Sequence, residues 1–136
     1  MRANNYAGSD VIKDETAQYI FPAALETNEW ALQGAWTVSA DKVTAAQRGA
    51  ALKIHFTAGK VYLVMGNKTN RSIKVTLRLN GESVINEKGN DVVNSVIDVN
   101  KHTLYNAIIL PHPASGILEL TVSEPGLEVY TFTFGN

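Results

Sequence analysis

Residues 71–81, with the sequence RSIKVTLRLNG, decide the fold class of this 136-residue chain. Aliphatic side chains at positions 73, 75, 77 and 79 alternate with polar ones, a period of two that is typical of a strand with one buried face. The pair Asn80-Gly81 follows and favours a two-residue hairpin turn, because both residues readily adopt positive φ. The stretch therefore predicts a β-hairpin whose second strand lies at residues 82–85.

The same alternation recurs along most of the chain. Residues 30–38 carry a large apolar side chain at every second position except Gly34, which indicates a bulge or a close approach of two backbones. Pro125 and Gly126 favour the two central positions of a turn. Further strands are predicted at residues 51–57, 61–65, 92–99, 104–110, 116–123 and 127–134.

This pattern predicts an all-β fold, a two-sheet antiparallel β-sandwich of jelly-roll type. The connections are short enough for antiparallel pairing throughout. No linker or repeat divides the chain, so we expect one domain over residues 1–136. Residues 1–29 are expected to be mostly loop and short strand packed on the sandwich, with one helical turn at residues 14–18.

Composition and charge exclude several classes of protein. Hydrophobic residues make up 45% of the chain and charged residues 18%, which is the balance of a packed globular domain. A formal net charge of −1 is too weak to attract nucleic acid. No apolar run approaches the ~20 residues of a membrane helix, and the first residues lack the apolar core of a signal peptide. We therefore expect a soluble chain that does not insert into a membrane.

The residues that carry chemistry form no catalytic set. The chain has no cysteine, which excludes disulfides and thiolate nucleophiles. His55, His102 and His112 are dispersed, and no serine lies in a nucleophile-elbow context. We therefore expect a protein that is not an enzyme and needs no cofactor.

Aromatic side chains are the candidates for ligand binding, because sugar rings stack their C–H faces on flat aromatic surfaces. The candidates are Tyr6, Trp30, Trp36 and Tyr105. Both tryptophans are in phase with the aliphatic positions of residues 30–38, so burial in the core is the alternative for them. Tyr6, in a loop, would contact a ligand, a neighbouring domain or its own sandwich.

Asp91 is the one weak candidate for a metal ligand. It follows Gly89-Asn90, and carboxylates in sandwich loops bind calcium in many proteins. The spacing of a calcium-binding loop is absent, however, and Asn-Asp after a glycine is an ordinary turn sequence. A role in the turn is the preferred interpretation.

Several segments together resemble one known family, the C-terminal domain that follows the thioredoxin-like domain in DipZ-type thiol:disulfide interchange proteins. The likeness covers nearly the whole chain. It is carried by residues 30–38, the turn at 89–92, Leu104-Tyr105 and the ending at residues 125–135.

The resemblance implies a jelly-roll domain similar to carbohydrate-binding modules, located outside the cytoplasmic membrane beside a redox domain. The Cys-x-x-Cys motif of that neighbour is absent from this chain, so redox activity is not expected here. The leading hypothesis is a non-catalytic accessory domain that binds a saccharide. The alternative is a docking domain for the thioredoxin-like domain or its client, with Tyr6 and an exposed stripe of Val129, Thr131 and Thr133 at the interface.

Overall fold

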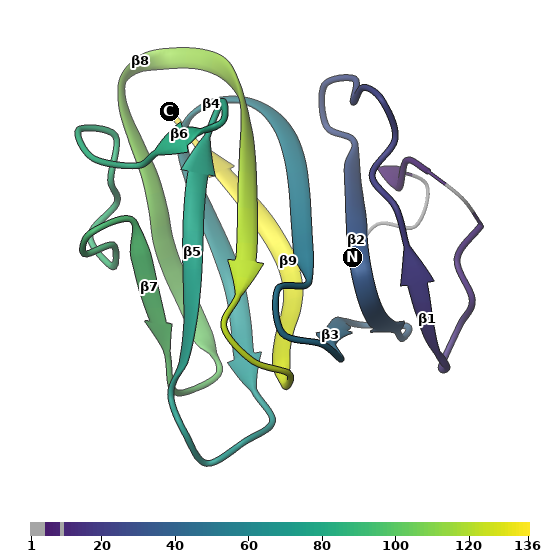
Figure 1. Cartoon of the computed structure of the whole chain (residues 1–136). Helices are drawn as coiled ribbons and strands as arrows, with labels where there is room; N and C mark the ends of the chain where they lie inside the picture. Colours follow the sequence, from purple (N-terminus) through teal and green to yellow (C-terminus); the bar gives the residue numbers. More distant parts are fainter. Residues whose placement is uncertain (1–4, 9) are drawn as a thin grey trace.

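A computed structural model describes residues 5–8 and 10–136 and shows an all-β chain (Figure 1). Nine strands form one continuous antiparallel sheet in this part of the chain, which confirms the predicted fold class. The strands are β1 (Thr16–Tyr19), β2 (Trp30–Val38), β3 (Val43–Ala45), β4 (Ala51–Asn67), β5 (Ile73–Leu79), β6 (Glu82–Ser83), β7 (Val96–Val99), β8 (Thr103–Val122) and β9 (Leu127–Gly135).

The sheet is continuous because β4 and β8 pass from one layer of the sandwich to the other. In Figure 1 both strands arch over the top of the molecule. The first half of β4 pairs with the second half of β8, and the second half of β4 with the first half of β8. Register shifts near Ala58 and Val61 permit the bend. The separate strands predicted at 51–57 and 61–65 are therefore one strand, as are those predicted at 104–110 and 116–123.

Four strands close a circuit of hydrogen bonds that positions the candidate site. The first residues of β2 pair with β4, and its last residues pair with the short strand β3. β3 pairs in turn with the start of β9, and β9 pairs with the second half of β4. β3 thus joins β2 and β9 at one end, whereas at the other end β2 and β9 separate and each pairs with β4.

The turn predictions agree well with the backbone. Asn80 and Gly81 have φ values of 53° and 84° and join β5 to the short strand β6. Gly126 has a φ of 111° in the turn before β9. Gly34, with a φ of 87°, lies within β2 where the pairing changes from β4 to β3, and a Cβ there would lie 3.2 Å from the Ala50 Cα.

Two local predictions are wrong. Residues 16–19 form strand β1 instead of a helical turn, because the edge of β2 offers unpaired backbone groups that this segment satisfies. The strand predicted at residues 92–99 begins only at Val96. Asn94 and Ser95, with φ values of 53° and 66°, form a tight hairpin before it.

The core fills the space between the layers with aliphatic and aromatic side chains. Trp30, Leu32, Trp36 and Val38 are all buried, as their common phase predicts. Phe56 of β4 is completely buried and stacks against Phe134 of β9, with ring centroids 6.5 Å apart. This contact joins the two layers directly.

Among the glycines, Gly89 allows the closest approach of two backbone segments. Its N–H donates to Ala107 at 2.9 Å, and a Cβ on it would lie 2.2 Å from the Asn106 carbonyl oxygen. We expect Gly89→Ala to lower the free energy of unfolding by about 3 kcal/mol, because the backbone must move to admit a methyl group. Urea unfolding measures this.

The matched control is Gly135→Ala, where the new Cβ would lie 3.5 Å from the Tyr62 ring, an ordinary contact. Its free energy of unfolding should stay close to the wild-type value. Equal losses in the two variants would show that the approach at Gly89 is not a constraint.

Candidate ligand-binding site

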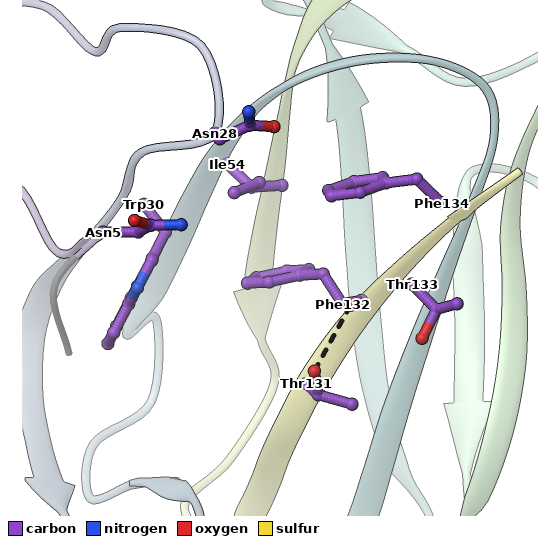
Figure 2. Close-up of a pocket in the computed structure, with 8 residues that line it drawn as sticks. All are labelled: Asn5, Asn28, Trp30, Ile54, Thr131, Phe132, Thr133 and Phe134. Atoms are coloured by element: carbon purple, nitrogen blue, oxygen red, sulfur yellow. Dashed lines mark hydrogen bonds between the residues drawn. The ribbon is translucent and has the colours of Figure 1, made fainter. Parts of the chain in front are cut away.

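A cavity of about 490 Å³ lies where β2 and β9 diverge. Figure 2 shows the side chains around it, which come from β2, β4, β9 and the segments before β2. They are Asn5, Asn28, Trp30, Ile54, Thr131, Phe132, Thr133 and Phe134.

The cavity exists because the pairing of β9 changes along its length. One edge of β9 pairs with β4 as far as Gly135, whereas the other edge pairs with β3 only at Glu128 and Val129. From Thr131 onward no described strand pairs with that second edge. The backbone of residues 131–134 therefore borders the cavity without a neighbouring strand.

The aromatic surface of the cavity comes from β9. Phe132 and Phe134 point toward Ile54, while Thr131 and Thr133 point the other way (Figure 2). Phe134 is 39% exposed although it stacks on Phe56. Part of its ring is thus held in place by the core while the rest is open to a ligand.

Trp30 forms the facing wall and is held from behind by Tyr6. The two rings are 4.8 Å apart in an edge-to-face arrangement, and the N–H of Ala7 donates to the Trp30 carbonyl at 2.7 Å. Trp30 is only 3% exposed, so it presents an edge to the cavity and not an open platform. Tyr6 packs on its own sandwich through Trp30 and Tyr19.

The polar side chains among the described residues that line the cavity are uncharged. Asn28 lies before β2 with a φ of 71°, a conformation that asparagine tolerates better than most residues. Its backbone N–H donates to the His55 carbonyl at 2.6 Å, which fixes the segment against β4. Asn5 adds a second carboxamide, and none of the eight lining residues is ionisable.

The other sequence candidates lie elsewhere. Trp36 is completely buried, and its indole N–H donates to the Gln33 carbonyl at 2.9 Å. Tyr105 and Asp91 line a second, shallower cavity of about 340 Å³. The Tyr105 hydroxyl donates to the Lys101 carbonyl, and the Asp91 carboxylate accepts from the Asn106 backbone N–H at 2.7 Å. Through these hydrogen bonds both side chains fix loops against β8.

The phenylalanines were missed by sequence analysis, although Tyr130, Phe132 and Phe134 stand at every second position. The stripe proposed on β9 also needs correction, because Val129 is completely buried. Opposite Val64 and Met65 the register of β9 shifts by one residue, so Val129 and Thr131 face different sides. The bulge leaves no signal in the sequence pattern.

One buried carboxylate lies outside the cavity. Glu128 is 2.6 Å from Lys42 Nζ, and this hydrogen bond raises the pKa of Lys42. The Tyr130 hydroxyl donates to Glu128 at 3.4 Å, and the Tyr130 ring stacks on His102. These contacts tie β9 to the turn before β3 and to the loop before β8, which explains the burial of the charge.

No group of three or more His, Cys, Asp or Glu side chains in the described part of the chain is placed to hold a metal ion. Likewise, the described residues contain no helix long and apolar enough to cross a membrane.

The strands and their pairing define a β-sandwich domain with an open cavity between β2 and β9. A family two carbohydrate esterase from Cellvibrio japonicus shares this fold, with a TM-score of 0.63 and 12% identity over 80% of this chain and 31% of that chain. A family two carbohydrate esterase from Clostridium thermocellum in complex with cellohexaose matches with a TM-score of 0.55 and 12% identity, covering 70% of this chain and 27% of that one. At this identity the likeness concerns the fold alone.

The chain belongs to the thioredoxin-like C-terminal domain family, whose model matches residues 1–135. It is also similar to Protein DipZ of Mycobacterium tuberculosis and of Mycobacterium bovis, with 26% identity to each over 136 residues. The match covers 96% of this chain and 17% of each relative. The chain thus spans about a sixth of the length of these relatives. The resemblance to DipZ-type proteins is therefore confirmed.

The Tyr6 hydroxyl makes the free energy of unfolding depend on pH. It is buried without a hydrogen-bond partner among the described residues, and burial raises the pKa of Tyr6 from 10.0 to about 12, with a smaller contribution from Tyr19. The folded state therefore holds this proton more tightly than the unfolded state. The resulting stabilisation is complete below pH 10.0 and is lost as the pH rises toward about 12.

We expect Tyr6→Phe to show a weaker fall in the free energy of unfolding over this pH range than the wild type. Near neutral pH the variant should be at least as stable, because it removes an unpaired buried hydroxyl. Urea unfolding of both proteins across the range measures the difference. Parallel pH profiles would contradict this account of Tyr6.

Proposed function

We propose that this chain is a non-catalytic accessory domain of an extracytoplasmic thioredoxin-like redox protein, and that it binds a saccharide in the β2–β9 cavity. Saccharide binding is supported by the kinds of side chain that line the cavity. Phe132 and Phe134 offer aromatic surface, and Asn5 and Asn28 offer carboxamides beside it. Saccharides present apolar C–H faces and hydroxyl groups at once, so they complement such a surface.

The accessory role is supported by family membership together with the absence of cysteine from the chain. Thiol:disulfide exchange requires a thiolate, so a redox reaction would depend on another part of the parent protein. The extracytoplasmic location is inferred from the similarity to DipZ. Saccharide binding there would hold the redox domain near a glycan.

The test is a glycan array followed by isothermal titration calorimetry on the glycans that bind. Phe134→Ala should weaken binding by about tenfold or more, because removal of an aromatic anchor commonly costs about 2 kcal/mol or more. Leu104→Ala is the matched control, since Leu104 is also an exposed apolar residue, at 49%, but does not line the cavity. Unfolding measurements on both variants separate binding from stability. No saccharide binding by the wild type would overturn the proposal.

A second function, protein docking, is favoured by the edge of β9 that pairs with no described strand from Thr131 onward. Its residues from Thr131 to Gly135 carry no charge or proline, which are the features that discourage strand addition. An extended segment of the thioredoxin-like domain or its client would pair with this edge through backbone hydrogen bonds.

The docking function is tested by mixing this domain with the thioredoxin-like domain of the same parent protein. Thr133→Lys should weaken a complex formed through the β9 edge, whereas Thr76→Lys, on the exposed face of β5, should not. Biosensor measurements that find no complex, or equal effects of the two lysines, would exclude this candidate.

A further inference from the structure

We infer that the β2–β9 cavity selects neutral saccharides and rejects acidic and amino saccharides. The inference rests on the saccharide-binding function proposed above and adds the chemical class of the ligand. It concerns charge, because none of the eight described lining residues is charged.

The described residues that line the cavity provide no counter-ion. All eight lining residues are aromatic, aliphatic, hydroxyl or carboxamide residues. A carboxamide has both a donor and an acceptor, as a sugar hydroxyl does, so Asn5 and Asn28 match hydroxyl groups in either direction. A carboxylate only accepts and an ammonium only donates, which leaves part of each carboxamide without a partner.

The ion pairs among the described residues lie away from this cavity. Four ion pairs are present in this part of the chain, and none of their members lines the cavity. The second cavity provides the contrast, because Lys74, Asp91 and Asp98 all line it. A charged ligand that entered the β2–β9 cavity would lose water without gaining a partner of opposite charge. Such burial is strongly unfavourable for a fully enclosed ion and less so at an open site.

Asn28 provides a way to reverse this selectivity. Aspartate has nearly the shape of asparagine and also tolerates positive φ, so Asn28→Asp adds a carboxylate with little change of backbone. The variant should then attract an amino saccharide and repel an acidic one more strongly. Asn94→Asp is the matched control, because Asn94 also has positive φ but lines the second cavity.

The experiment compares three β-1,4-linked hexasaccharides by calorimetry in mildly acidic buffer. They are neutral cellohexaose, its hexauronate oxidised at the primary hydroxyls, and the chitosan hexamer with protonated amino groups. We expect cellohexaose to bind at least about tenfold more tightly than either charged oligomer, a difference of about 1.4 kcal/mol. Asn28→Asp should raise the affinity for the chitosan hexamer severalfold, and Asn94→Asp should not.

The outcomes distinguish selectivity for neutral saccharides from saccharide binding itself. Binding of the hexauronate or the chitosan hexamer as tightly as cellohexaose would overturn the selectivity while leaving saccharide binding intact. An unchanged affinity of Asn28→Asp for the chitosan hexamer would also overturn it. Absence of binding by all three oligomers would overturn the selectivity, and absence of binding on the glycan array would overturn the proposed function as well.

Discussion

The continuous hydrogen-bonded ladder of β4 is the constraint on which the rest of the structure depends. Its two halves pair with opposite halves of β8, so one strand belongs to both layers of the sandwich. β2 joins the first half of β4 and β9 joins the second, with β3 bridging the other ends of β2 and β9. Because β4 bends between these two pairings, β2 and β9 must diverge, and the cavity lies in the resulting gap.

This origin explains why the cavity combines rigidity with exposed backbone. Phe134 is anchored by stacking on Phe56, and Trp30 is anchored by Tyr6, so both walls are fixed by the core. Between them one edge of β9 pairs with no described strand from Thr131 onward. A preorganised aromatic surface loses little conformational entropy when a ligand binds, which favours a binding role over a packing role for this gap.

Residue alternation predicted the fold class and the phase of Trp30 and Trp36, and the residue types at Asn80-Gly81 predicted the turn. Each of these depends on local sequence, because period-two burial and positive φ are properties of neighbouring residues. The residues that line the cavity are determined instead by which strands lie side by side. The bulge that buries Val129 and turns Thr131 outward is set by pairing with Val64 and Met65, far away in sequence. Consequently Trp30 was found for its residue type, whereas Phe132 and Phe134 were missed.

A ¹⁵N–¹H NMR titration of the domain with cellohexaose shows whether a ligand binds in the gap between β2 and β9. We expect shift changes confined to Asn28, the indole N–H of Trp30 and the backbone of residues 131–135, which line or border the cavity. Changes centred on Lys74, Asp98 and Tyr105 at the second cavity, or no changes at all, would contradict this expectation.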